Sequence, residues 1–399
     1  MSVRCAWLLS FAVTLTGCRK APVPNEGPAR GEGQGHEADG GALSADAAAP
    51  ESRWFCAARA GEAFALPREA ELGTLDYGAE DDAAPLLAYI APTDGARHHA
   101  TLQLKPASAP RVGPTAAGDV PPWTPIVGAA GEGSARIVAG AMARWVLELG
   151  GRDVVEAPLA LGDELAIDAL ATGEAKAVVA VSSAEGVDVR AVEGSRVVRA
   201  FRVDGGESPA LLRGEGGAVA VAVRVETPAE AAKPVRDVPT ASLEGAGQDR
   251  STATLVVVDG NGTRLASLAL GAAEELVAVT PSRRSLVLGA RRVLEGQAVV
   301  DLARVGADGR RTRIGEFPRR RGSRLVPIED GRDGRIDAVL EVSSDGVAAL
   351  GVRAGSLGLP DVDAVLAART HGDELDLVGV RDVATAPQVV RVTCRWEVR

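Results

Sequence analysis

The stretch AVVAVSSAEGV, residues 177–187, has the form of one strand followed by a turn and the start of the next strand. A run of apolar residues leads into two serines and a glycine-containing turn. A similar stretch, AVLEVSSDGV, occurs at 338–347, with Val342 at the position of Val181. Short apolar runs that are rich in β-branched residues and bounded by turn residues predict strands. The recurrence indicates a repeated structural unit, with about three units between the two copies.

Other runs of the same length extend this pattern over residues 53–399. Examples are APLLAYIA (84–91), SARIVAG (134–140), SRVVRAFRV (195–203), ATLVVVDG (253–260), TRLASLALG (263–271) and QVVRVTCRWEV (388–398). Glycine and asparagine at the joins supply the positive φ that tight hairpins need. We count about 27 candidate strands with about 13 residues for each strand and its turn, which gives about six or seven units of four strands.

Repetition of four-stranded sheets predicts an all-β fold, a β-propeller of about six or seven four-stranded blades. The proline-rich stretch 227–250 is then an inserted linker within the domain. The alternative is a chain of two or more β-sandwich-like domains, with a break at 106–122 or at 227–250. Both hypotheses place the folded part of the chain at residues 53–399.

The N-terminus, MSVRCAWLLSFAVTLTGC, has the layout of a secretory signal peptide over residues 1–17. A positive residue, Arg4, precedes an apolar run that is too short to span a bilayer stably. The residues LTGC, 15–18, resemble the lipobox of bacterial lipoproteins. That resemblance implies cleavage before Cys18, acylation of Cys18 and, with Arg19 rather than aspartate next, anchoring in the outer membrane. Whether the domain faces the periplasm or the cell surface is left open.

Residues 18–52 are rich in glycine, alanine, proline and acidic side chains. A segment with so few large apolar residues cannot offset its ordering entropy, so it is predicted to be a disordered acidic tether. The two remaining cysteines, Cys56 and Cys394, lie at opposite ends of the domain. An oxidising compartment favours a disulfide between them, which would join the two ends of a propeller. Two reduced thiols, or a metal or redox pair, are the alternatives.

The sequence EDGRDGRIDAVLEV, 329–342, resembles the calcium loop of FG-GAP-type propeller repeats. In that register Glu329, Gly331, Asp333 and Asp337 take the ligand positions. Calcium binds six to eight oxygen atoms, and here one position has no side chain. The segment is therefore either a weak calcium site or an acidic hairpin turn without a metal. Apart from this calcium, we predict no cofactor.

Arginine is concentrated between residues 283 and 324, which hold twelve arginines and four acidic residues. Guanidinium groups suit phosphate and carboxylate ligands. The candidate binding residues are Arg310, Arg311, Arg313, Arg319, Arg320, Arg321 and Arg324. The alternative is a solvated face whose charge is balanced by acidic residues of neighbouring units.

The net charge of −10 disfavours binding to nucleic acid. The sequence has no metalloprotease, P-loop or nucleophile-elbow motif, and no catalytic residues are predicted. We expect a lipid-anchored binding module of the cell envelope that recognises an envelope protein or an acidic glycan. The alternatives are a polysaccharide hydrolase or lyase on the same scaffold, and a structural lipoprotein of an envelope assembly.

Overall fold

The structure is a computed structural model that describes most of the predicted domain. The described residues are 52–78, 84–93, 96–109, 111–112, 126–128, 134–140, 144–149, 152–158, 166–173, 176–227, 252–271, 273–294, 296–320, 322–351, 353–359, 362–381 and 387–398. The predicted signal peptide, Cys18 and residues 19–51 of the predicted tether lie outside this range. Arg321 and residues 228–250 of the predicted linker lie outside it as well.

The described chain is almost entirely β-strand, and five four-stranded antiparallel sheets follow one another along it. The first sheet is formed by β2 (Glu71–Asp76), β3 (Leu86–Thr93), β4 (Ala96–Gln103) and β5 (Arg111–Val112). The second is formed by β6 (Ile126–Gly128), β7 (Ser134–Gly140), β8 (Arg144–Leu149) and β9 (Arg152–Pro158). The third is formed by β10 (Ile167–Gly173), β11 (Lys176–Ser183), β12 (Gly186–Glu193) and β13 (Arg196–Asp204). The next two are formed by β14 (Gly206–Arg213), β15 (Val219–Thr227), β16 (Thr252–Asp259) and β17 (Arg264–Ala269), and by β18 (Glu274–Val279), β19 (Ser285–Leu294), β20 (Gln297–Gly306) and β21 (Arg311–Pro318). A short 3₁₀ turn, η1 (Glu215–Gly217), joins β14 to β15. Among the described residues, no helix is long and apolar enough to cross a lipid bilayer.

The remaining eight strands form one closed sheet. Its first half is β22 (Arg324–Asp330), β23 (Ile336–Ser343), β24 (Gly346–Gly351) and β25 (Gly355–Leu357), and its second half is β26 (Ala364–His371), β27 (Glu374–Arg381), β28 (Gln388–Val398) and β1 (Ser52–Ala65). Within each half the strands are antiparallel, whereas the halves meet through the parallel pairs β22–β26 and β1–β25. Divided at these pairs, the closed sheet adds two four-stranded units to the five sheets.

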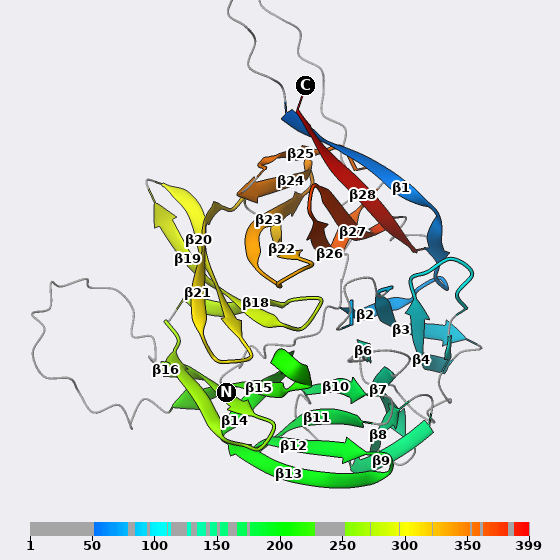
Figure 1. Ribbon diagram of the computed structural model, residues 1–399, viewed down its shortest axis with the longest axis vertical. Helices are drawn as coiled ribbons and strands as arrows, with labels where there is room; N and C mark the ends of the chain where they lie inside the picture. Colours follow the sequence, from blue (N-terminus) through cyan, green and yellow to red (C-terminus); the bar gives the residue numbers. More distant parts are fainter. Residues whose placement is uncertain are drawn as a thin grey trace, which may run out of the picture.

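The four-stranded units stand in a ring around a common centre (Figure 1). This arrangement confirms the predicted all-β propeller and not the alternative of separate sandwiches. The two similar sequences that predicted the repeat occupy equivalent positions. AVVAVSS lies on β11 and AVLEVSS lies on β23, and each is the second strand of its unit, three units apart. Thr227 and Thr252 pair directly, so the predicted linker joins two neighbouring strands of one sheet.

The hydrophobic core lies between neighbouring units around the ring. Each apolar cluster in the described part of the chain takes residues from two adjacent units; one, for example, joins Val179 of β11 to Leu211 of β14 and Val221 of β15. A second joins Leu212 of β14 to Leu288 of β19. The units that contribute to these described clusters therefore each share their core with a neighbour.

The ring is closed by strands from the two ends of the chain. β1 pairs with β28, and Cys56 lies directly opposite Cys394, to which it is joined by a disulfide. The predicted bridge is therefore present. Trp54 and Trp396 pack edge to face beside it, with ring centroids 5.1 Å apart. The indole N–H of Trp54 donates to the carbonyl of Arg353 at 3.0 Å.

Removing the disulfide is expected to weaken this closure. We expect the double variant Cys56→Ala/Cys394→Ala, in a Cys18→Ser background, to lose about 2–5 kcal/mol of unfolding free energy, because the unfolded chain is no longer cross-linked. Urea unfolding followed by circular dichroism measures this loss. The parent treated with a reductant should match the double variant, whereas equal midpoints for the double variant and the oxidised parent would contradict the prediction.

Candidate functional site

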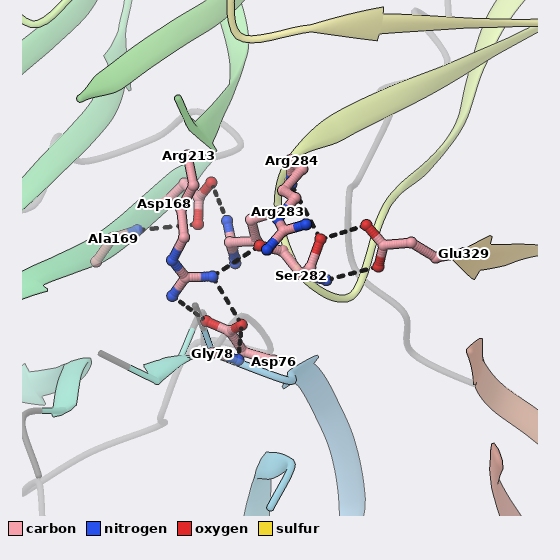
Figure 2. Close-up of polar contacts among 9 residues, drawn as sticks. All are labelled: Asp76, Gly78, Asp168, Ala169, Arg213, Ser282, Arg283, Arg284 and Glu329. Carbon is pink, nitrogen blue, oxygen red and sulfur yellow. Dashed lines mark hydrogen bonds and ion pairs between the residues drawn. The ribbon is translucent and has the colours of Figure 1, made fainter. Parts of the chain in front are cut away.

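The turn between β18 and β19, residues 280–284, lies at the centre of the ring and contacts four other units (Figure 2). The carbonyl of Pro281 accepts a hydrogen bond from the amide of Tyr77, which follows β2, at 3.0 Å. The carbonyl of Arg283 accepts one from the amide of Arg213, at the end of β14, at 2.7 Å. Ser282 contacts β22 and Arg283 contacts β10. We call residues 280–284 the axial turn.

Two arginine–carboxylate pairs fix the axial turn on the side of β2, β10 and β14. Arg283 Nη1 lies 2.6 Å from Asp168 Oδ2, and both side chains are buried. Arg213 binds Asp76 through both guanidinium termini, at 3.0 and 2.9 Å, and also donates to the carbonyl of Ser282 at 2.9 Å. Asp168 also accepts hydrogen bonds from the backbone amides of Ala169, at 2.9 Å, and Leu211, at 2.8 Å.

The nearby carboxylates favour the charged form of the buried Arg283 side chain. Burial alone would lower the pKa of Arg283, but the carboxylates of Asp168 and Asp76 outweigh burial and raise that pKa above its usual value. Arg283 also has a left-handed backbone, with φ of 58°, which costs a non-glycine residue on the order of 1 kcal/mol. The backbone bond to Arg213 and the ion pair with Asp168 hold it there.

On the other side of the axis, Glu329 of β22 is fully buried and faces Ser282. The amide of Ser282 donates to Glu329 Oε2 at 3.1 Å, and the Ser282 hydroxyl donates to Glu329 Oε1. Burial raises the pKa of Glu329, while the Ser282 hydrogen bonds and the nearby charges of Arg369 and Arg284 oppose that rise. Folding therefore makes Glu329 easier to protonate than an exposed glutamate.

The three axial carboxylates, Asp76, Asp168 and Glu329, are thus committed to structural contacts. Asp76 and Asp168 are each bound by an arginine and by backbone amides, and Glu329 is bound by a serine. General acid–base catalysis needs a carboxyl group that can reach a substrate.

An open cavity of about 1140 Å³ lies beside the axial turn, over the sheets β14–β17 and β18–β21. It is bordered by η1 and by the turns β16–β17, β18–β19, β20–β21 and β22–β23. The charged residues that line it are Arg213, Arg284, Arg304, Arg310 and Arg332, together with Glu215, Asp259, Asp308 and Asp333. We call it the face cavity.

Backbone carbonyls orient two of the cavity arginines. Arg284 Nη1 donates to the carbonyl of Arg332, and Arg304 Nη1 donates to the carbonyl of Gly334, each at 3.2 Å. A carbonyl positions a guanidinium group without neutralising it. The side chains of Arg310 and Arg332 are exposed, and neither forms an ion pair with another described residue.

Three acidic residues of the face cavity are occupied by local contacts. Asp259 accepts the amides of Asn261 and Thr263, both at 2.8 Å. Asp308 accepts the amide of Arg310 at 2.9 Å. Asp333 binds the amide and the guanidinium group of Arg335, and these bonds lower its pKa although partial burial acts in the opposite direction. These carboxylates therefore shape the turns around the cavity, while Arg310 and Arg332 are exposed at its border.

The structure places only one of the predicted binding arginines, Arg310, in the face cavity. The others that it describes are Arg311, bound to Glu274; Arg313, bound to Asp301 and Glu316; Arg319, 4.0 Å from Glu275; Arg320, near Glu341 and Asp345; and Arg324, whose pKa is lowered by burial. Arg311, Arg313, Arg319 and Arg320 therefore each lie within ion-pair distance of an acidic side chain. That these arginines bind a ligand stays a prediction. Arg321 lies outside the described residues.

The structure does not assemble the predicted calcium ligands. Glu329 turns inward to Ser282, whereas Asp333 binds Arg335 and Asp337 is exposed. Gly331 packs so closely against His371 that an added Cβ would lie 2.5 Å from the His371 Cε1 atom. Within the described residues there is no group of three or more His, Cys, Asp or Glu side chains placed to hold a metal ion.

The axial residues Asp76, Asp168 and Arg213 were not predicted from the sequence. One signal was available, because Asp76 and Asp168 are isolated acids within the otherwise apolar stretches ELGTLDYG and AIDALATG. Each lies on the first strand of its unit, the position nearest the axis. A lone charge in a buried strand requires a partner.

Comparisons with known proteins were made for sequence and for structure. No known family profile and no curated protein sequence matches the chain. Similar solved structures include the β-propeller domain of the Trilobed protease from Pyrococcus furiosus (TM-score 0.47, 9% identity, 84% of this chain and 97% of that chain covered). BBS1N in complex with ARL6DN is similar with a TM-score of 0.41 and 14% identity, over 82% of this chain and 96% of that chain. The subtype N11 neuraminidase-like protein of A/flat-faced bat/Peru/033/2010 is similar with a TM-score of 0.39 and 6% identity, over 86% of this chain and 93% of that chain.

The pH dependence of stability tests the environment of Glu329. An acid whose pKa is raised by folding binds protons more tightly in the folded state, so its contribution to stability falls as pH rises from about 4.5 through the raised value. We therefore expect the unfolding free energy of the parent, relative to Glu329→Gln, to decrease over this range in urea titrations. Glu316→Gln, which removes an exposed carboxylate, is the matched control. A difference that is constant or increases with pH would contradict the assignment.

Proposed function

We propose that the chain is a lipoprotein of the outer membrane, anchored through Cys18, whose propeller is a non-catalytic binding module for an anionic glycan of the cell envelope. The observation that carries this proposal is the division of charge between the axis and the face cavity. Arginines and serine occupy the carboxylates on the axis, whereas Arg310 and Arg332 border an open cavity without acidic partners among the described residues.

The chemistry of the face cavity supports an anionic ligand. Arginine presents several N–H donors in a planar fork that matches carboxylate and phosphate oxygens. Arg284, Arg310 and Arg332 come from three different turns, and Arg304 comes from β20, so their guanidinium groups surround the cavity instead of forming a row along one strand. A ligand with more than one negative group, such as an acidic saccharide, can contact several of them at once.

Catalysis is the less favoured alternative. A glycoside hydrolase needs two carboxyl groups on either side of the scissile bond. The acids of the face cavity whose contacts were traced above bind backbone amides or Arg335. The binding function therefore explains the arginines and the engaged acids together.

Binding to an acidic polysaccharide tests the proposal. We expect the protein to bind polygalacturonate and not neutral dextran, and the double variant Arg310→Ala/Arg332→Ala to bind at least about tenfold more weakly, because two charge-assisted contacts are lost. Isothermal titration calorimetry at low and moderate salt measures the dissociation constants.

Arg196→Ala is the matched control, because Arg196 is an exposed arginine on β13 outside the face cavity. If Arg196→Ala weakens binding as much as the cavity variant does, the binding depends on the general charge of the protein and the proposed site is wrong. Binding to a protein of the envelope with no affinity for acidic glycans would overturn the choice of ligand.

A further inference from the structure

We propose that the face cavity is directed toward the membrane that carries the lipid anchor, and that its ligand is the phosphate of a lipid headgroup in that same membrane. This inference rests on the proposed anchor and on the anion-binding role proposed for the face cavity, and it names a lipid phosphate in place of a glycan as the anion. It is carried by the position at which the chain enters the propeller, together with the chemistry of the cavity.

The turns that border the face cavity all emerge on one face of the ring. In a four-stranded antiparallel unit, the turn between the first and second strands and the turn between the third and fourth strands lie at the same end. The face cavity is bordered by the turns β14–β15, β18–β19 and β22–β23 of the first kind, and by β16–β17 and β20–β21 of the second kind.

The N-terminal end of β1 lies on this same face. Ser52 pairs with Val398 at the end of β28, and the nearby amide of Trp396 donates to the carbonyl of Asp373 in the turn β26–β27. β22 and β26 are parallel neighbours, so the turns that follow them, β22–β23 and β26–β27, emerge together. The amide of Gly331, in the first of these turns, donates to the carbonyl of Thr370, at the end of β26.

The described chain therefore begins, at Ser52, on the face that holds the cavity. The proposed tether has 35 residues, from Cys18 to Ser52, and a flexible coil of that length spans on the order of 30 Å. It confines the domain near the bilayer, and linkage of this kind gives effective concentrations on the order of millimolar. The headgroup contact that the propeller makes by itself is then strengthened by this confinement.

The cavity offers contacts for the phosphate of a phospholipid and for the apolar acyl region next to it. Arg310 and Arg332 are exposed at its border, and Arg284 and Arg304 are held by backbone carbonyls behind them. Leu265, 46% exposed, also lines the cavity and offers an apolar contact. Because the whole chain carries a net charge of −10, an anionic surface repels it overall, so binding requires a specific site such as this one.

Vesicle binding tests the inference with the mature chain bearing Cys18→Ser, so that only the propeller can hold the membrane. We expect co-sedimentation with vesicles of phosphatidylcholine and phosphatidylglycerol, and little with phosphatidylcholine alone. Arg310→Ala/Arg332→Ala should weaken this binding at least about tenfold, and Arg196→Ala should leave it unchanged. Millimolar inorganic phosphate should compete poorly, because a single headgroup is only part of the membrane surface that is contacted.

The possible outcomes separate the two proposals. If the cavity variant lowers polygalacturonate binding but no chain sediments with vesicles, the face cavity binds a soluble anion and the membrane inference is wrong. Equal binding to both kinds of vesicle, or full competition by inorganic phosphate, would also overturn it. If neither ligand distinguishes the cavity variant from the control, both proposals are wrong.

Discussion

The ion pairs around the axial turn are the constraint on which the arrangement of the inner strands depends. A buried charge is costly unless it is paired and hydrogen-bonded, and removing one partner of a buried pair commonly costs about 3–5 kcal/mol. Arg283 and Asp168 therefore specify where the unit β18–β21 lies relative to the unit β10–β13. Arg213 and Asp76 do the same for β14 and β2. Hydrophobic contacts between neighbouring units are less selective, because they tolerate small displacements.

The pairing of β1 with β28 closes the ring at its outer edge, and the axial turn connects units at its centre. At the rim, β1 completes the unit of β26–β28, and the disulfide fixes its register. Arg391 reinforces this closure by binding Glu62 of β1 at 2.9 Å and Asp376 of β27 at 2.7 Å. At the axis, one turn joins units that are not neighbours in sequence. The fold is thus closed both by a covalent link between the chain ends and by buried charge pairs at the centre.

Much of the fold could be predicted because its signals are local. Strand-length apolar runs, hairpin glycines and the similarity of residues 177–187 to 338–347 each depend on a few adjacent residues. The cysteine pair was also accessible, because Cys56 and Cys394 are the only cysteines in the predicted domain. An exported chain that brings its ends together can then form only one intradomain disulfide.

The candidate site could not be predicted in the same way, because its contacts join distant residues. Asp76 and Arg213 are separated by 137 positions, and Asp168 and Arg283 by 115. No period in the sequence relates such positions. The contacts of the arginine-rich stretch have the same limit, because Arg311 on β21 pairs with Glu274 on β18 and Arg313 pairs with Asp301 on β20, and only the fold brings these residues close. Arg310 differs from them because it lies in a turn.

The division between axis and cavity follows from the same geometry. The axial turn occupies the centre of the ring and engages the carboxylates there in structural contacts. Of the arginines that line the face cavity, Arg310 and Arg332 lie in turns on one face, on the side where β1 begins. Substitutions at the axis should therefore change the stability of the fold, whereas substitutions of Arg310 and Arg332 should change ligand binding.

A double-mutant cycle on Arg283 and Asp168 tests the central claim most directly. The variants Arg283→Met, Asp168→Leu and the combination are compared by urea unfolding, with apolar replacements so that neither position gains a new polar contact. We predict that each single change costs about 3–5 kcal/mol and that the combination costs well below their sum, because no uncompensated charge remains. Losses that add within about 0.5 kcal/mol would show that the pair does not hold the units together.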